Sequence, residues 1–181
     1  HRGICNMLYW SQSSLELSAT DKVLQTVPFS FDPSVWQIFW PLCFGAQLVM
    51  ARPDGHKDPA YLVKTISSQQ ITIIALPPSI LRVFLEEKGI ENCKHLKHLV
   101  CGGEPLALEL VERWFERLNL HNVLHNAYGP TEASIHTTYW VCQHGTTYSS
   151  VPIGRPINNS QVYILDEYLQ PVPIGVSGEL Y

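Results

Sequence analysis

The segment from Asn126 to Glu132 holds the residue types best suited to binding a phosphate-bearing ligand. Tyr128 offers a flat ring that can stack on a base, and Thr131 offers a hydroxyl for a phosphate oxygen. Glu132 offers a hard oxygen ligand for Mg²⁺. Residue types alone leave an ordinary turn between a strand and a helix, with an exposed acid, equally open.

Two further positions have both a structural and a chemical interpretation. Asp32 precedes Pro33, so its carboxylate can cap a helix, or it can pair with the ammonium group of a ligand. A carboxylate has enough lone pairs to do both. Gly102-Gly103 either marks a tight turn or lets the backbone approach a ligand closely.

Other familiar chemistry fits the sequence poorly. Four side chains able to bind zinc lie close together, namely Cys93, His95, His98 and Cys101. A strand would point His98 and Cys101 to opposite faces, and it would separate His121 from His125 by roughly 13 Å. The chain also lacks a P-loop, a G-x-G-x-x-G run and a G-x-S-x-G run, which disfavours ordinary NTPases, Rossmann dehydrogenases and α/β-hydrolases.

Helix starts and short apolar runs alternate along the chain. Helices are expected after Asp32-Pro33, Asp58-Pro59 and Glu104-Pro105, and from Ser79 to Lys88 with Gly89 as the stop. Apolar runs expected to form strands buried on both faces are 71–75, 96–101 and 122–125. Two further strands, 137–141 and 161–165, follow without a helix between them.

This alternation predicts an α/β fold. We expect a doubly wound, mostly parallel sheet with flanking helices over about 1–136, followed by a β-rich extension over about 137–181. Ligands bind beyond the carboxyl ends of strands in such a sheet. The segments 76–78, 102–104 and 126–132 should therefore converge on one crevice, with Asp32 nearby.

Composition narrows the class of protein. The chain has 181 residues, 45% of them hydrophobic, and a formal net charge of −4, which disfavours a nucleic-acid partner. The five cysteines lie among apolar neighbours, as in reduced cytosolic proteins, and no secretory signal opens the sequence. The most apolar stretch, 36–51, is interrupted and shorter than the ~20 residues of a membrane-spanning helix. We expect a cytoplasmic protein without a membrane partner.

At these residues the sequence resembles the adenylation domain of nonribosomal peptide synthetases, in the adenylate-forming enzyme superfamily. The matching stretches, in the family's order and across essentially the whole chain, are Phe31-Asp32-Pro33-Ser34, Gly102-Gly103-Glu104-Pro105-Leu106, Asn126 to Glu132, Val151 to Pro156, and Gly178-Glu179-Leu180. Asn-Ala-Tyr-Gly-Pro-Thr-Glu is the most specific of them. The resemblance implies the large N-terminal domain of such an enzyme, in part.

The resemblance also implies roles for individual residues. Tyr128 would stack on adenine, Thr131 would contact the α-phosphate and act in catalysis, and Glu132 would act with it by holding Mg²⁺. The remaining ATP-binding residues would be Gly102, Gly103, Glu104, Asn126, Ala127 and Gly129. Asp32 would bind the substrate ammonium group, and the rest of the amino-acid pocket would be Pro33, Trp36, Ala75, Leu99, Cys101, Ala127, Ile135 and His136.

The implied reaction joins an amino acid to AMP, releases pyrophosphate, and passes the acyl group to the phosphopantetheine thiol of a carrier domain. Carrier and condensation domains of the same synthetase would be its partners. Small Ala75 and Ala127 beside large Trp36 favour an aromatic or large apolar substrate, and a charged side chain would lack a partner.

The family's phosphate loop is expected upstream of His1, and its small C-terminal domain downstream of Tyr181. We therefore expect this chain to be an internal segment of one adenylation domain, inactive by itself. Two alternatives stay open: a ligase that activates a fatty, aryl or hydroxy acid, and an α/β module that binds a nucleotide without turnover. Asp32 disfavours the first, because such an acid has no ammonium group, and Glu132 disfavours the second.

Overall fold

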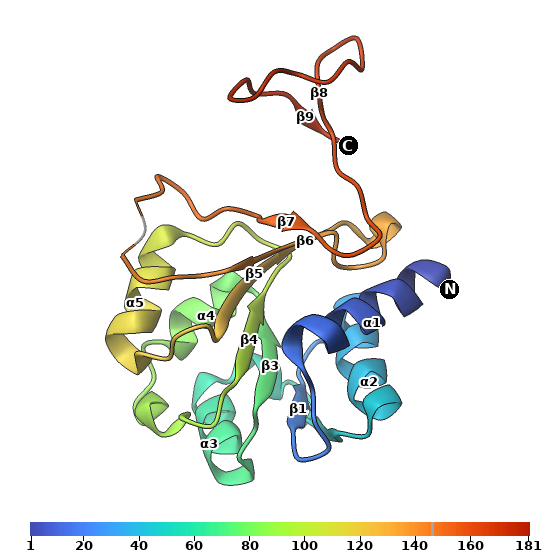
Figure 1. The fold of residues 1–181 in the computed structure, drawn as a ribbon. Coiled ribbons are helices and arrows are strands. Elements are labelled where there is room, and N and C mark those ends of the chain that lie inside the picture. Colours follow the sequence, from blue (N-terminus) through green and yellow to red (C-terminus); the bar gives the residue numbers. More distant parts are fainter. Residues whose placement is uncertain (146) are drawn as a thin grey trace.

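A seven-stranded sheet forms the centre of the computed structural model, which describes residues 1–145 and 147–181. The strands lie in the order β2-β1-β3-β4-β5-β6-β7 (Figure 1). Their bounds are Lys22–Gln25 (β1), Gln47–Met50 (β2), Ile73–Leu76 (β3), His98–Cys101 (β4), Leu124–Tyr128 (β5), Thr138–Val141 (β6) and Arg155–Pro156 (β7). Strands β1 to β5 are mutually parallel, whereas β6 and β7 are antiparallel to their neighbours. The predicted doubly wound, mostly parallel α/β sheet is confirmed.

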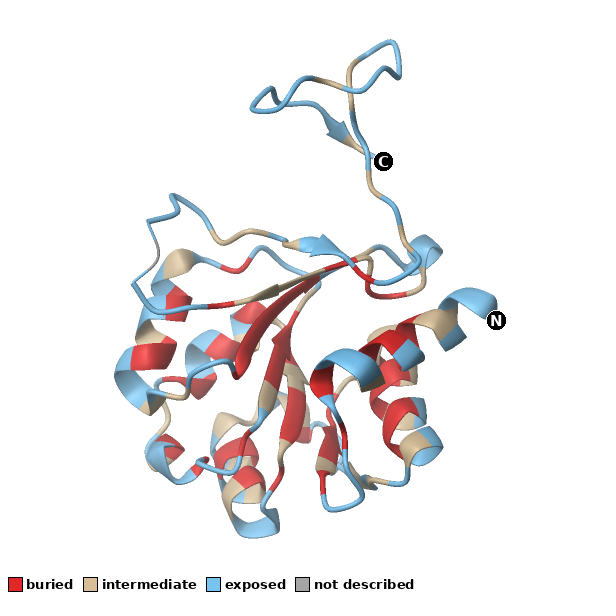
Figure 2. Cartoon of the chain, in the orientation of Figure 1, coloured by how far each residue is buried: buried red, intermediate tan, exposed pale blue. Residues whose placement is uncertain are grey.

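Helices cover both faces of this sheet (Figure 1). Their bounds are Arg2–Leu15 (α1), Pro33–Phe44 (α2), Pro59–Gln69 (α3), Pro78–Phe84 (α4) and Leu108–Leu118 (α5). Neighbouring strand residues face opposite sides, so Ile73 packs with α1 and α2 while Ile74 packs with α3, α4 and α5. Figure 2 shows the buried residues on the strands and on the helix surfaces turned toward them.

The strand order creates a crevice beside β1. The chain passes from β1 to β2 on one side and later places β3 on the other side, so the connections after β1 and β3 leave toward opposite faces. Ligands bind at such a switch point, beyond the carboxyl ends of the strands. The topology therefore places a candidate site where β1 and β3 end.

The predicted helix start at Asp58 is confirmed. The Asp58 carboxylate accepts a hydrogen bond of 3.0 Å from the Tyr61 backbone N–H, and Pro59 occupies the first helical position. Leu62, Val63 and Ile66 then bury one stripe of α3 against the sheet. Local sequence and tertiary packing agree at this helix.

Two other predicted helix boundaries are wrong. Helix α5 begins at Leu108 rather than at Pro105, because the Glu104 carboxylate accepts hydrogen bonds from the Ser79 N–H and hydroxyl, both 2.9 Å, instead of capping. Helix α4 ends at Phe84 rather than at Lys88, since the following residues continue in tighter turns with i→i−3 hydrogen bonds.

The strands predicted at 137–141 and 161–165 are both present, although the second is limited to Ile164–Leu165. Strand β6 pairs with β5, and β7 pairs with β6, so the main sheet continues past residue 136. Strands β8 (Ile164–Leu165) and β9 (Glu179–Leu180) pair in a separate ribbon that stands away from the main sheet (Figure 1). Of the predicted β-rich extension, therefore, β6 and β7 belong to the main sheet and only the β8–β9 ribbon is separate from it.

An ion pair between the buried Asp21 and the exposed Lys97 joins two connections at the amino ends of the strands. The Asp21 carboxylate lies 2.7 Å from the Lys97 ammonium group and accepts hydrogen bonds from the Ser18 N–H and hydroxyl at 2.8 and 2.6 Å. Burial by itself raises the pKa of Asp21, but the bonds from Lys97 and Ser18 outweigh it and lower this pKa to about 2.

We expect this pair to make stability depend on pH under acid conditions. The pKa of Asp21 is lower in the folded state than in the unfolded state. Its contribution to the free energy of unfolding is therefore fully present above about pH 4 and is lost as pH falls toward 2. Its size is on the order of 2 kcal/mol. Chemical denaturation at pH 7 and pH 3 should show that Asp21→Asn reduces the difference between the two free energies of unfolding. An equal difference in variant and parent would contradict the assignment.

Candidate functional site

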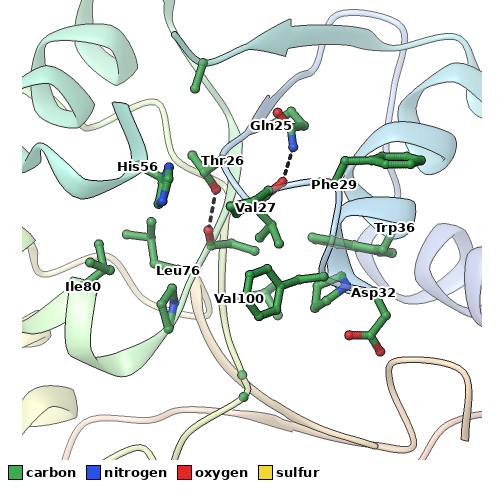
Figure 3. Close-up of a pocket in the computed structure, with 18 of the residues that line it drawn as sticks. Gln25, Thr26, Val27, Phe29, Asp32, Trp36, His56, Leu76, Ile80 and Val100 are labelled. Carbon is green, nitrogen blue, oxygen red and sulfur yellow. Dashed lines mark hydrogen bonds between the residues drawn. The ribbon is translucent and has the colours of Figure 1, made fainter. Parts of the chain in front are cut away.

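A cavity of about 1020 Å³ opens where β1 and β3 end, at the crevice that the topology creates. Its walls come from the loops after β1 and β2, the start of α2, the ends of β3 and β4, and the loop after β5. Asp32, Trp36 and Val100 lie near one another in Figure 3, and His56 lies on the other side of the cavity. Segments distant in sequence thus meet at one site.

Asp32 lines this cavity without capping its helix. Its backbone is already helical, with φ −57° and ψ −32°, and its side chain makes no hydrogen bond to the first turn of α2. The expectation that Asp32 caps a helix with its side chain is therefore wrong. Among the ion pairs of the described ranges 1–145 and 147–181, none includes Asp32. Its carboxylate is available to a cationic ligand group.

Trp36 and His136 form a buried part of the cavity wall. The Trp36 ring stacks on Trp40 at 5.1 Å, and its indole N–H donates to the Ser11 hydroxyl at 3.0 Å. The His136 ring lies 5.5 Å from the Trp36 ring, and burial lowers the pKa of His136 to about 4. His136 is therefore neutral near pH 7 and presents no charge to a ligand.

Most residues predicted for the amino-acid pocket are brought together here. The cavity is lined by Asp32, Pro33, Trp36, Ala75, Ala127, Ile135 and His136. Ile135 holds a positive φ of 80°. The convergence of these residues from α2, β3, β5 and the loop before β6 supports the predicted crevice.

Leu99 and Cys101 are exceptions, and their assignment to the pocket is corrected. Both are fully buried on the opposite face of the sheet, in the core with α3, α4 and α5. Their neighbours Val100 and Gly102 line the cavity instead. A displacement of one residue along a strand reverses the face to which a side chain points, which accounts for the error.

Glycines permit close packing around the loop after β5. A Cβ atom on Gly129 would lie 2.4 Å from the Ile135 carbonyl oxygen, and one on Gly102 would lie 3.0 Å from the Ala127 carbonyl oxygen. Gly103 has a φ of 81° and open space around it. Gly102, Gly103 and Gly129 all line the cavity, so backbone groups can approach a ligand there.

Of the other predicted nucleotide residues, Glu104 belongs to the cavity wall, whereas Asn126, Tyr128, Thr131 and Glu132 do not. Tyr128 ends β5 with its side chain exposed, and Thr131 and Glu132 occupy an exposed 3₁₀ turn, Thr131–Ala133. The buried Asn126 amide donates to the Pro152 carbonyl at 2.9 Å. Glu104 lines the cavity, although its carboxylate already accepts two hydrogen bonds from Ser79.

Two of the four histidines considered as zinc ligands from the sequence, His98 and His125, form a pair outside the cavity. His98 Nδ1 and His125 Nε2 lie 2.9 Å apart, and His98 Nε2 donates to the Leu15 carbonyl at 3.1 Å. Burial lowers the pKa of His125 to about 3 and that of His98 in the same direction. Outside position 146, which the structure leaves undescribed, no three His, Cys, Asp or Glu side chains form a metal-binding group.

A family model described as AMP-binding enzyme matches residues 1–181. The chain belongs to the AMP-binding enzyme family. Tyrocidine synthase 3 of Brevibacillus parabrevis is 43% identical over 180 residues, which make up 99% of this chain and 3% of that protein. Phosphinothricin tripeptide synthetase PhsB of Streptomyces viridochromogenes is 45% identical over 181 residues, or 100% of this chain and 15% of that protein.

Solved structures of AMP-binding enzymes have the same fold. The nonribosomal peptide synthetase FmoA3 superposes with a TM-score of 0.91 at 25% identity, covering 99% of this chain and 20% of that one. The Vibrio cholerae adenylation domain AlmE, in complex with glycyl-adenosine-5'-phosphate, gives 0.87 at 26% identity, covering 98% and 34%. The predicted resemblance to synthetase adenylation domains is confirmed, and the chain spans a small part of each of these proteins.

In this AMP-binding enzyme, sequence reasoning missed the part of the site that the loop after β2 contributes, which includes Arg52 and His56, and it also missed the wall beside β1. The residues of that wall are Gln25, Thr26, Val27, Pro28, Phe29 and Phe31. They start at the last residue of β1, a four-residue strand whose pattern gave no signal for a strand. The four-residue strand β2 was missed as well, and so was α1, whose N-cap residue His1 makes no side-chain cap bond.

Proposed function

We propose that this site activates an amino acid with ATP, forming an aminoacyl-adenylate and pyrophosphate. The substrate carboxylate attacks the α-phosphorus of ATP, the new O–P bond forms, and the bond to pyrophosphate breaks. The observation that carries the proposal is the Asp32 carboxylate, which lacks a cap bond and faces the same cavity as Gly102 and Gly129. An amine and a nucleotide can thus meet at one opening.

Asp32 supplies recognition of the amine. It stands beside apolar residues such as Pro33 and Trp36, where a charge-assisted bond to an ammonium group is stronger than in water. Holding the amine there orients the substrate carboxylate toward the nucleotide side of the cavity. An acyl or aryl acid without an amine gains nothing from this contact.

The nucleotide side is assigned to the loops after β4 and β5. The Tyr128 ring, 42% exposed at the end of β5, supplies a stacking surface for adenine. Gly102 and Gly103 let the backbone approach the nucleotide, and the exposed Thr131 hydroxyl supplies a contact for the α-phosphate. Glu104, Asn126, Ala127 and Gly129 complete this side by holding the loops in place.

Glu132 is the residue proposed to hold Mg²⁺. Its carboxylate is exposed, follows the predicted phosphate contact Thr131 directly, and is a hard oxygen ligand. Magnesium in nucleotide sites is commonly held by one or two carboxylates together with substrate phosphates, so this residue fits. When bound, Mg²⁺ offsets the negative charge that develops on the phosphates.

We expect Glu132→Gln to reduce adenylation much more than ATP binding. The amide keeps the shape of the side chain but loses the charge that holds the metal. A decrease of roughly 100-fold in kcat with less than about a threefold change in the dissociation constant of ATP is expected, equivalent to about 3 kcal/mol in the reaction step. Exchange kinetics and calorimetry in the full-length protein would measure both. Equal loss in both quantities, or loss in neither, would contradict the metal role.

The side-chain pocket favours an aromatic or large apolar amino acid. Its members Ala75 and Ala127 are small, Trp36 is large and aromatic, and His136 is neutral near pH 7. A charged substrate side chain would therefore be buried without a charged partner here. Val100 and Gly102 replace Leu99 and Cys101 in this proposal.

A pair of substitutions in β4 tests that corrected register. We expect Val100→Leu to shift preference toward smaller amino acids by roughly 10- to 200-fold in kcat/KM, the effect typical of one methylene in an apolar pocket. Leu99→Ala should instead cost about 2–5 kcal/mol of stability and leave the order of preferred substrates unchanged. Exchange assays across a substrate panel and chemical denaturation would measure these effects. A change of substrate preference in the Leu99 variant alone would show that Leu99, and not Val100, faces the pocket.

Further partners belong to the same proposal. The acyl group would pass to the phosphopantetheine thiol of a carrier domain, with a condensation domain in the same synthetase, and the chain would be an internal segment of one adenylation domain. No helix in the part of the chain described is both long enough and apolar enough to cross a bilayer. A cytoplasmic location stays a prediction.

The test compares amino acids with matched acids that lack the amine. In the full-length protein, substrate-dependent exchange of pyrophosphate into ATP should occur with a large apolar or aromatic amino acid and be strongly reduced with its deaminated analogue. Faster exchange with the analogue would favour an acyl- or aryl-activating ligase. ATP binding without exchange by any acid would favour a non-catalytic nucleotide-binding module.

A further inference from the structure

Gln37 is a fully buried polar side chain one position after Trp36 on α2. Its Oε1 accepts hydrogen bonds from the backbone N–H groups of Thr26 and Val27, at 3.1 and 2.9 Å. Its Nε2 donates to the Leu24 carbonyl at 3.3 Å and to the Thr26 hydroxyl at 3.1 Å. The Gln37 amide thus accepts two hydrogen bonds and donates two, which uses both of its N–H groups and both lone pairs of its oxygen.

The Thr26 hydroxyl extends this network to the next strand. It donates to the Ala75 carbonyl at 2.9 Å, a direction fixed because a carbonyl oxygen accepts only (Figure 3). Ala75 lies on β3 and lines the cavity. One glutamine therefore links the helix that follows Asp32 to the ends of both strands at the switch point.

The same glutamine anchors the loop that carries Asp32. Strand β1 ends at Gln25, and residues 26–32 then run along the cavity to the start of α2. Gln37 lies on α2, the helix that follows this loop, and it binds the first two residues of the loop, Thr26 and Val27. Asp32 makes no side-chain cap bond of its own, so its position depends on contacts made elsewhere in the loop and helix.

We propose that Gln37 is a positioning residue of the amino-acid site, acting through Thr26 and Val27 at the start of the loop to hold Asp32 and Ala75 in their places around the cavity. The inference rests on the proposed function, because the contact that it positions is the one to the substrate amine. Gln37 does not line the cavity, so it acts through these neighbours rather than on the ligand.

Gln37→Met in the full-length protein is the main test. Methionine keeps the length and approximate volume of the side chain but leaves the two backbone N–H groups buried without a partner. We expect the amides of residues 26–32 to exchange hydrogen roughly tenfold faster, and the KM for the amino acid to rise by about the same factor. The KM for ATP should change by less than about twofold, since the loops after β4 and β5 are not touched.

Gln12→Met is the matched control. Gln12 accepts a hydrogen bond from the Trp40 indole at 3.2 Å and donates one to the Leu17 carbonyl at 2.9 Å, but it does not line the cavity. Losing these bonds should lower stability without raising the KM for the amino acid. A purely structural role of Gln37 would give the same pattern in both variants.

Thr26→Val provides a second variant if Gln37→Met fails to fold. It keeps the three bonds of Gln37 to the backbone but removes the bond of Gln37 to the Thr26 hydroxyl and the link of that hydroxyl to Ala75, so a smaller rise in the amino-acid KM is expected. Unchanged hydrogen exchange in residues 26–32, or parallel rises in both KM values, would overturn the inference. If the parent shows no amino-acid-dependent exchange, the proposed function fails, and hydrogen exchange alone still decides whether Gln37 holds the loop.

Discussion

Asp32→Ala in the full-length protein should remove about 2–5 kcal/mol of amino-acid recognition, which is the largest effect on substrate binding that we expect from a single change. The loss arises because the substrate ammonium group would remain in a partly apolar cavity without its charged partner. It should be measured as a fall in kcat/KM for amino-acid-dependent pyrophosphate exchange. The KM for ATP should remain close to that of the parent, since the nucleotide loops are unchanged.

Asp58→Ala is the matched control for this prediction. Asp58 also precedes a proline at a helix start, but it caps α3 and pairs with Arg52 at 2.6 Å. Its loss should cost about 1 kcal/mol of stability and leave amino-acid recognition unchanged. If Asp32→Ala lowers kcat/KM by less than about tenfold, roughly 1.4 kcal/mol, the proposed ammonium contact is wrong.

Gly129→Ala should impair both the nucleotide side of the site and the amino-acid pocket. The added Cβ would lie 2.4 Å from the Ile135 carbonyl oxygen and 2.7 Å from the Thr137 nitrogen, and these backbone atoms cannot rotate away as a side chain can. The loop must therefore open, which displaces Tyr128 on one side and Ile135 on the other. We expect a loss of about 1–3 kcal/mol in stability and a rise in the KM values for ATP and for the amino acid.

Gly45→Ala separates this effect from ordinary backbone strain. Gly45 ends α2 with a φ of 79° and has no atom within 4 Å of an added Cβ, so its substitution should cost about 1–2 kcal/mol without affecting either KM. Denaturation and exchange assays on both variants measure the difference. Unchanged KM values in the Gly129 variant would show that the loop does not couple the two halves.

Much of the fold was predictable because it follows from local rules. The cap and proline at Asp58-Pro59 favour a helix start through local interactions alone. The apolar runs that form β3, β4 and β5 are typical of strands packed against helices on both faces of a sheet. The missed strands β1 and β2 are four residues each, too short to show a period. Their existence depends on pairing with neighbours rather than on their own pattern.

The site was predictable in its members but less so in its geometry. Asp32, Trp36 and His136 reach the cavity as expected, whereas Tyr128 and Glu132 lie outside its wall. The wall after β1 was missed, because it follows a strand of four residues whose pattern is too short to show a period.

The sequence by itself determined the class of fold, the helix start at Asp58 and the residue types available for binding an amine, a nucleotide and a metal. The tertiary structure alone decided that Val100 rather than Leu99 faces the cavity and that the Asp32 carboxylate leaves its helix uncapped. The reason is geometric. Side chains on a strand alternate between two faces, and only the helices packed on each face determine which of them becomes core and which becomes cavity.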